Sequence, residues 1–448
     1  MPSDLLAART QMAVSLGFHI IFAEIGVAMP LLMVLAEWRW RRTGDQVYRE
    51  LAGRWARGTA ILFAVGAVSG TVLSFELGLL WPGFMRFAGS IIGMPFSLEG
   101  FAFFTEAIFL GIYLYGWERI GPRAHLAAGV IVAASGAASA AFVVLVNAWM
   151  NAPVGFRTAA GGRLIDIDPI VGMQSPAAFQ QALHMLLAAY AATGMAVAGV
   201  HALLLLKGRA PEFHRRALSI ALIVGAPAAV LQPLSGDLSA RVVAITQPMK
   251  LAALEGQWNT ERAAPLRIGG WPDADREQTR WALEIPYGLS LLAFHDPEAE
   301  VRGLKSVPRA DRPPVAVVHF AFQTMVGLGS LLAATALAAG WIAWRRRDLT
   351  RTRWLLTALA IAAPFGFIAT EAGWIVTEVG RQPWIVQGLL RTSDAVTPMP
   401  GLFVPMLLFI LLYAVLATVV VTLISTMVRE TSVMSTAPDG ADASAVSQ

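Results

Sequence analysis

The chain has 448 residues, of which 56% are hydrophobic and only 14% charged, and its mean hydropathy is +0.59. In soluble domains about a quarter of the residues are charged, so this composition excludes an ordinary soluble protein. The absence of cysteine excludes disulfides and thiolate-bound metal centres. A net charge of +4 does not indicate nucleic-acid binding, because the arginines lie between apolar runs. No removable signal peptide is predicted, since the N-terminus lacks a short apolar segment with a cleavage site.

About nine apolar runs are long enough to cross a membrane as helices. They are expected near residues 11–37, 56–80, 96–117, 124–149, 177–206, 217–233, 315–344, 354–379 and 401–428. The sequence therefore predicts an all-α polytopic membrane protein, with a single membrane domain over residues 1–448.

Positive charge is concentrated in every second connection. The rich connections carry Arg39, Arg41, Arg42, Arg49, Arg54 and Arg57, then Arg119 and Arg123, then Lys207, Arg209, Arg215 and Arg216, and finally Arg345, Arg346, Arg347, Arg351 and Arg353. Because cytoplasmic loops are rich in Lys and Arg, the N-terminus is predicted to be periplasmic and the C-terminus cytoplasmic.

Two segments differ from the rest of the chain. Residues 234–313 form a long external connection of mixed charge, and connections of this length are usually functional or disordered. Within it, Ile285–Leu292 is apolar enough to pack, which argues against a simple linker. Residues 431–448 are rich in Ser, Ala and Asp and are predicted to be a disordered tail.

Acidic residues recur inside the predicted spans. Glu371 and Glu378 are seven residues apart, as are Glu99 and Glu106, so each pair lies on one helix face. A charge in the bilayer centre costs at least about 2.5 kcal/mol, so such acids usually serve protons, ions or metals. Glu24 and Glu76 are further candidates. The competing interpretation is a set of glutamates hydrogen-bonded inside a helix bundle.

Three residues that can ligate haem iron lie at similar depth. His19, His184 and Met325 are each about 10–15 Å below the predicted external surface. His184 and Met325 could therefore be the two axial ligands of one haem. Taken singly, each also fits ordinary packing or a hydrogen-bonded core histidine, which is the interpretation kept for His201.

The external segment contains a cation and an acid beside apolar residues. Lys250 and Glu255 stand in Met249–Trp258, where they could hold a quinol head group, with the acid accepting its proton. A solvated amphipathic helix is the alternative, and the residues alone favour it.

Together these motifs resemble subunit I of the cytochrome bd quinol oxidases. The resemblance covers nearly the whole chain, from His19 to Trp384. It rests on four motifs in family order: the Glu99–Glu106 pair, Lys250-Leu-Ala-Ala-Leu-Glu255, Met325-Val-Gly, and Gly380-Arg-Gln-Pro-Trp384 after an acid.

This resemblance implies a set of haem ligands. His184 and Met325 would bind a low-spin haem b, while His19 and Glu378 would be axial ligands of two high-spin haems. Those two would be a haem b with either a haem d or a second haem b. Further roles implied by the resemblance fall on Glu99 and Glu106 (proton routes beside the high-spin pair), Trp374 (between haems), Arg9 and Arg381 (haem propionates), and Lys250 and Glu255 (a short quinol-binding loop).

The implied function is that of a terminal oxidase of the bacterial inner membrane. It would oxidise ubiquinol or menaquinol on the periplasmic side and reduce dioxygen to water with cytoplasmic protons, building a proton gradient without pumping. A second large subunit and a small single-helix subunit would be its partners.

The chain departs from the family pattern at two positions. Gln323 replaces an arginine that often stands two residues before the methionine, and Glu24 is not expected at its position. Without that arginine, the low-spin haem should be easier to oxidise. Both departures fit a divergent branch such as the cyanide-insensitive group, and Glu371 has no role by resemblance.

Two other function classes remain open from the sequence. One is a haem-free proton or ion carrier that uses Glu99, Glu106, Glu371 and Glu378. The other is an oxidase-like homologue that binds haem without reducing oxygen.

Overall fold

The computed structural model describes residues 3–345 and 348–434. Within these ranges nine helical segments are long and apolar enough to cross a membrane, which confirms the predicted fold class. The helices that form them are α1 (Asp4–Thr43), α2 (Gln46–Leu80), α3 (Pro82–Tyr115), α4 (Pro122–Asn151), α6 (Ala178–Leu206), α7 (Pro211–Thr246), α10 (Val315–Trp344), α11 (Arg353–Ala362) with α12 (Phe365–Val379), and α14 (Phe403–Met434).

Several helix boundaries differ from the predicted ones. Helix α3 begins at Pro82 rather than near 96. Helix α7 continues to Thr246 rather than ending near 233, so the connection between α7 and α10 is shorter than predicted. Both predicted boundaries fell at prolines, Pro95 and Pro233, which lie inside the helices. Prolines are tolerated there because neighbouring groups in a packed bundle satisfy the freed backbone carbonyls.

The C-terminal third shows two further differences. The predicted span 354–379 is divided between α11 and α12, because Pro364 interrupts the helix. Helix α14 runs to Met434, past the predicted start of the tail at 431. The remainder of that predicted tail, 435–448, lies outside the described residues.

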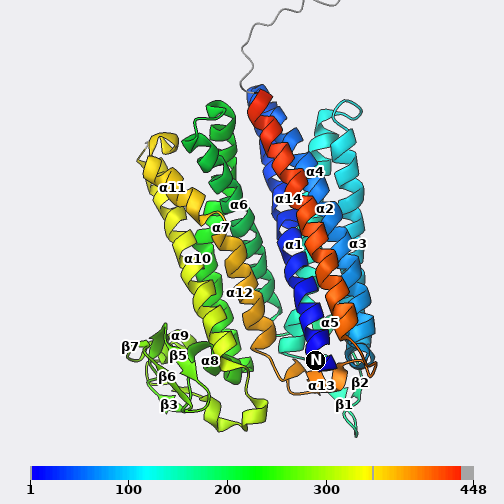
Figure 1. The fold of residues 1–448 in the computed structure, drawn as a ribbon, viewed down its shortest axis with the longest axis vertical. Coiled ribbons are helices and arrows are strands. Elements are labelled where there is room, and N and C mark those ends of the chain that lie inside the picture. The colour runs from blue at the N-terminus through cyan, green and yellow to red at the C-terminus, as the bar shows by residue number, and fades with distance from the viewer. Residues whose placement is uncertain (1–2, 346–347, 435–448) are drawn as a thin grey trace, which may run out of the picture.

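The helices form two groups that lie side by side (Figure 1). One contains α1 to α4 and α14, and the other contains α6, α7, α10, α11 and α12. Helix α1 contacts α4 within its own group and α6, α7 and α12 in the other, so it lies between them. An apolar core inside the second group is formed by α6, α7, α10 and α11.

Glycines allow the closest helix contacts in the second group. A Cβ on Gly366 of α12 would lie 2.3 Å from the Cα of Ala192 on α6, and one on Gly194 would lie 2.6 Å from the Cα of Gly225 on α7. Small residues are favoured at such contacts in membranes because they let helix backbones approach closely.

We expect Gly366→Ala to destabilise the protein by about 1–3 kcal/mol, because the added methyl group meets backbone rather than a flexible side chain. Gly26→Ala in α1 is the matched control, because a Cβ there meets nothing within 4 Å. Thermal denaturation in detergent should lower the midpoint for Gly366→Ala only. Equal midpoints for the two variants would contradict the close α6–α12 contact.

Short elements occupy the connections, and most lie at the end of the bundle that carries the N-terminus (Figure 1). They are β1 (Arg157–Thr158), β2 (Leu164–Ile165), α5 (Pro169–Met173), α8 (Pro248–Glu255), β3 (Glu261–Arg262), β4 (Leu266–Ile268), β5 (Trp271–Asp273), β6 (Gln278–Arg280), β7 (Leu283–Ile285), α9 (Gly288–Phe294), β8 (Glu300–Val301), β9 (Trp384–Val386), β10 (Leu390–Arg391), α13 (Thr392–Ala395) and the 3₁₀ turns Leu304–Ser306, Arg309–Asp311 and Leu349–Arg351. The strands pair antiparallel as β1–β2, β3–β8, β4–β7, β5–β6 and β9–β10. The connection between α7 and α10 is therefore folded, as the apolar stretch within it predicted.

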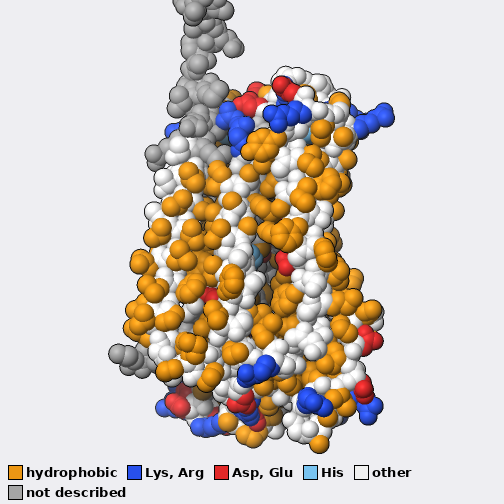
Figure 2. Space-filling model, turned by 90° about the vertical axis from the view of Figure 1, so that its right-hand side faces the viewer, with side chains coloured by type: hydrophobic (Ala, Val, Ile, Leu, Met, Phe, Trp, Pro, Cys, Tyr) orange, Lys and Arg blue, Asp and Glu red, His pale blue; other side chains and the backbone are white. Residues whose placement is uncertain are grey.

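Side-chain chemistry divides the surface into zones. Hydrophobic side chains cover the middle of the face in Figure 2, while Lys and Arg gather at its two ends. This distribution matches a hydrocarbon layer bounded by two aqueous surfaces.

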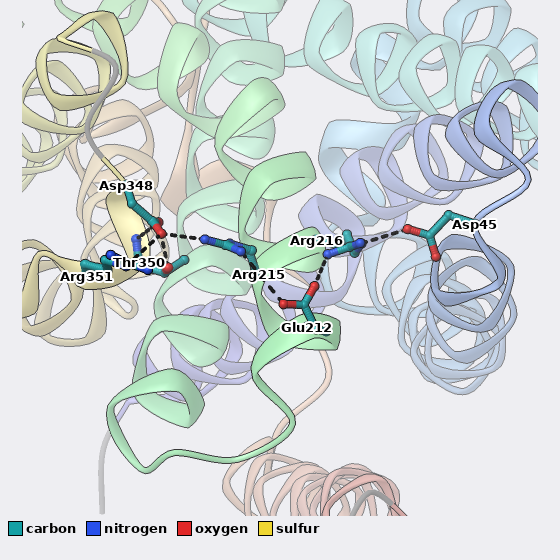
Figure 3. Close-up of polar contacts among 7 residues, drawn as sticks. All are labelled: Asp45, Glu212, Arg215, Arg216, Asp348, Thr350 and Arg351. Carbon is teal, nitrogen blue, oxygen red and sulfur yellow. Dashed lines mark hydrogen bonds and ion pairs between the residues drawn. The ribbon is translucent and has the colours of Figure 1, made fainter.

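Ion pairs join both helix groups at the end opposite the N-terminus (Figure 3). Arg216 of α7 contacts Asp45 at 2.8 Å, in the connection between α1 and α2. Its neighbour Arg215 pairs with Asp348, which precedes α11, and Glu212 contacts both arginines. Hydrogen bonds from Thr350 and the charge of Arg215 lower the pKa of the Asp348 carboxyl. The network ties α7 to the start of both α2 and α11.

Candidate functional site

Two candidate histidines are oriented by serines on neighbouring helices. The Nδ1 of His19 lies 2.9 Å from the Ser69 hydroxyl of α2, and the Nδ1 of His184 lies 2.8 Å from the Ser235 hydroxyl of α7. Each serine donates its own hydrogen to a carbonyl of its helix, so its oxygen can accept from the imidazole. Nδ1 is then the protonated nitrogen, and Nε2 keeps the lone pair that a metal needs.

A second contact supports this tautomer at His184. The amide nitrogen of Gln232 lies 3.1 Å from the Nε2 of His184 and donates to the His184 carbonyl as well. An amide NH₂ group only donates, so Nε2 must be the acceptor. Iron ligation at Nε2 would require Gln232 to withdraw its amide.

Met325 points from α10 towards α12. A Cβ on Gly373 would lie 2.9 Å from the Met325 sulfur, so this glycine makes room for the thioether. Trp374 follows directly and is half-buried. His184 and Met325 stand on α6 and α10, two helices that both contact α7 and α12. Their pairing on one haem remains a prediction.

Glu378 lies in the last turn of α12, among polar partners. Its carboxylate accepts from the Asn147 amide of α4 and pairs with the Arg381 guanidinium at 2.5 Å. Arg381 is only 2% exposed, and its Nε and Nη1 find no partner among the described residues. Burial lowers the pKa of Arg381, and the Glu378 charge opposes that shift. Buried donors of this kind suit an anionic ligand, so Arg381 fits the predicted propionate role, while the iron role of Glu378 stays a prediction.

The seven-residue pair of α3 faces α4. Ser139 donates to the Glu99 carboxylate at 3.2 Å, and a Cβ on Gly136 would lie 3.1 Å from the Glu106 carboxyl group. The two acids therefore share one helix seam, as the spacing predicted. Arg9 is half-buried in the second turn of α1, and its propionate role stays a prediction. Glu24 of α1 is buried, and Glu371 of α12 packs against Gly17.

Lys250 is an internal anchor rather than a solvated cation. It is only 4% exposed, and its ammonium group donates to the Asn151 side chain at 2.6 Å and to the Thr377 carbonyl at 3.0 Å. Burial lowers its pKa well below the ordinary value, and the Arg381 charge acts in the same direction. Lys250 thereby joins α8 to α4 and to the turn that carries Glu378.

Glu255 ends the same short helix in a different environment. It is buried, and its Oε2 finds no hydrogen-bond partner among the described residues. Burial raises the pKa of Glu255 to about 8, while the Arg267 guanidinium and backbone oppose the shift. A carboxyl group with that pKa can accept a proton near neutral pH. These contacts rule out the fully solvated helix that the residues alone had favoured.

Several residues around the site were not singled out from the sequence. They include the serines behind the two histidines, Gln232, Asn147, Asn151 and His319. Asn147 and Asn151 carried a usable signal, since amide side chains are costly inside an apolar span. The serines carried none, because serine is common in membrane helices.

A helix bundle whose inner faces present imidazole, thioether and carboxylate groups, beside a buried guanidinium with two nitrogens that lack partners among the described residues, has the donor groups expected of a membrane-bound redox protein. Residues 7–432 match the family profile described as cytochrome bd terminal oxidase subunit I. The chain belongs to this family, whose subunits are membrane oxidoreductases. The predicted family, enzyme class and multi-pass membrane location are thus confirmed, and membership in a cytochrome family implies haem cofactors.

Relatives of the chain are similar over most of their length. A protein of Bacillus subtilis (strain 168), provisionally described as cytochrome bd menaquinol oxidase subunit I, is 39% identical over 91% of this chain and 92% of its own. The cytochrome bd-II ubiquinol oxidase subunit 1 of Escherichia coli (strain K12) is 30% identical over 87% and 88%, respectively. A solved structure of bd oxidase from Geobacillus thermodenitrificans has a TM-score of 0.90 and 41% identity, covering 96% of this chain and 99% of that one.

Proposed function

We propose that the chain is the quinol-oxidising, haem-carrying subunit of a terminal oxidase that reduces dioxygen to water. The observation that carries this proposal is the donor set itself. His19 and His184 are held with Nε2 as the lone-pair nitrogen, and Glu378 lies beside Arg381, whose buried Nε and Nη1 have no partner among the described residues. A haem-free ion carrier has no use for that combination.

The residues present fit the haem roles assigned to them. His184 and Met325 would hold a low-spin haem b, His19 and Glu378 two high-spin haems, and Arg381 a propionate. The haems would supply one-electron transfer and the binding and reduction of dioxygen. One high-spin haem would be a haem b, and the other a haem d or a second haem b.

The protein groups would handle the protons. Glu255 lies in the folded external connection and would accept a proton from quinol, while Lys250 fixes the helix that carries it. Glu99 and Glu106 on the α3–α4 seam would deliver protons to the high-spin side. The arginine-rich connections support a periplasmic quinol side, so the reaction would separate charge without a pump.

Further partners follow from the family and the surface. Large apolar side chains are exposed along α3 and α14, including Phe101, Phe104 and Leu411, as expected for contact with lipid or a second subunit. Subunit II and a small single-helix subunit would bind the chain in the bacterial inner membrane. Either ubiquinol or menaquinol is consistent with the site.

The test is a reduced-minus-oxidised absorption spectrum of the purified oxidase, followed by quinol-dependent oxygen uptake. We expect bands of one low-spin and two high-spin haems, and oxygen consumption when quinol is added. A spectrum without haem bands would favour the carrier function. Haem bands without oxygen uptake would instead indicate a homologue that does not reduce oxygen.

A further inference from the structure

His319, in the first half of α10, contacts the folded connection between α7 and α10. This side chain is fully buried, and both of its ring nitrogens face backbone carbonyls: Nδ1 lies 2.7 Å from the Leu254 oxygen and Nε2 lies 3.1 Å from the Gly269 oxygen. Carbonyls only accept, so the ring nitrogen that carries the hydrogen donates to the carbonyl it faces. His319 therefore joins the end of α8 to the turn after β4.

Gln323, one helical turn further along α10, holds the same turn from the other side. Its side-chain oxygen accepts from the Gly269 amide at 3.1 Å, and its side-chain nitrogen donates to the Arg267 carbonyl at 3.1 Å. Gly269 is thus held at both its carbonyl and its amide, by two residues of one helix.

The turn at Gly269 and Gly270 has little conformational freedom. Gly269 and Gly270 both have positive φ angles, +66° and +99°, which other residues adopt only with strain. A Cβ on Gly270 would lie 2.9 Å from Ala282 and Thr279 side-chain carbons. Trp271 then packs on Phe320 of α10, with ring centroids 5.0 Å apart. The contact between the turn and α10 is therefore a fixed interface.

This interface adjoins the proposed proton acceptor Glu255 and the proposed haem ligand Met325. The Leu254 carbonyl that His319 holds belongs to the residue directly before Glu255. Gln323 stands two residues before Met325, on the same helix. The Arg267 backbone that Gln323 holds also belongs to the residue that opposes the Glu255 pKa shift.

We propose that His319 and Gln323 are positioning residues that hold the quinol-proton acceptor and the Met325 ligand in a common frame. This inference rests on the proposed function. The two residues touch neither the substrate nor the iron, and they act by fixing the backbone around Glu255 and the start of the Met325-bearing helix. Gln323 therefore holds the turn at Gly269 in this chain. Its role is more than the loss of the arginine charge that the family often has at this position.

The test is Gln323→Met, which keeps the side-chain length and removes both hydrogen bonds. In the full oxidase we expect the KM for quinol to rise about tenfold with a smaller change in kcat, because ground-state positioning is lost. The low-spin haem band or midpoint potential should shift, while the high-spin bands stay unchanged. Hydrogen exchange of the Gly269 amide should accelerate about tenfold, a result that does not depend on turnover.

Matched variants distinguish loss of the hydrogen bonds to the turn from general destabilisation of the protein. Gln323→Glu keeps the acceptor for the Gly269 amide, so its exchange should stay slow while the bond to Arg267 is lost. His319→Asn is compared with His295→Asn, which removes an exposed imidazole from the connection that His319 contacts. Only the His319 variant should raise KM, and if it does not assemble, Gln323→Met decides.

A Gln323→Met enzyme with wild-type KM, low-spin band and Gly269 exchange would overturn the proposal. Equal loss of all three haem bands would also overturn it, because it would show a purely structural role. A wild-type protein without haem or oxygen uptake would instead refute the proposed function, even if Gly269 exchange responded as expected.

Discussion

Met325→Leu is expected to remove the low-spin haem signal and leave the two high-spin signals in place. Leucine has nearly the same volume as methionine, so the packing against Gly373 should change little. It has no sulfur lone pair, however, so the low-spin iron would keep only His184. Replacing a residue that only supports a metal ligand lowers metal affinity or activity by about 10–100-fold. Loss of the ligand itself should therefore lower the rate of quinol oxidation by more than about 100-fold.

Reduced-minus-oxidised spectra of the variant and the wild type provide the measurement. Met195→Leu is the matched control, because Met195 is equally apolar, fully buried in the α6–α7 core and not a proposed ligand. It should retain all three haem signals. An unchanged low-spin band in Met325→Leu would show that another residue binds that iron.

Glu255→Gln is expected to lower kcat/KM for quinol by about 100–10,000-fold, the range typical of losing a general base. The amide keeps the shape of the side chain but cannot accept the quinol proton. Glu284→Gln is the control, because Glu284 also contacts Arg267, at 2.9 Å, yet is exposed on β7. Wild-type turnover in Glu255→Gln would remove the acid from the mechanism.

The pH profile gives an independent check on Glu255. Burial raises the pKa of Glu255 to about 8, so at neutral pH most of the side chains are protonated and inactive as bases. Below the pKa, the ionised fraction of Glu255 grows about tenfold for each unit by which the pH rises. Therefore kcat/KM should rise from pH 6 to 8 and level off above, and this rise should be absent in Glu255→Gln. A decline over the same range would contradict its role as a base.

Hydropathy and charge were enough to predict the helix number and class, because the bilayer admits few alternatives. Boundaries failed where prolines were involved, as at Pro95 and Pro233. A proline's effect depends on whether neighbouring helices satisfy the freed carbonyl, and a single sequence does not contain that information.

Some candidate residues could be singled out from the sequence because polar and ionisable side chains are costly inside a membrane. Glu99, Glu106, Glu378 and the two histidines are of this kind, and their haem and proton roles stay predictions. Their partners were not found, since Ser69, Ser235 and Asn147 come from other helices and become informative only when those helices are packed. The same holds for His319 and Gln323, whose contacts are backbone atoms of a distant turn.

The serine behind each histidine also determines what happens to protons when a metal binds. Because Ser69 and Ser235 hold the imidazole hydrogen on Nδ1, coordination at Nε2 displaces no proton. Haem loading at these two histidines should therefore release no acid. A thiolate site, by contrast, would release one proton for every ligand formed.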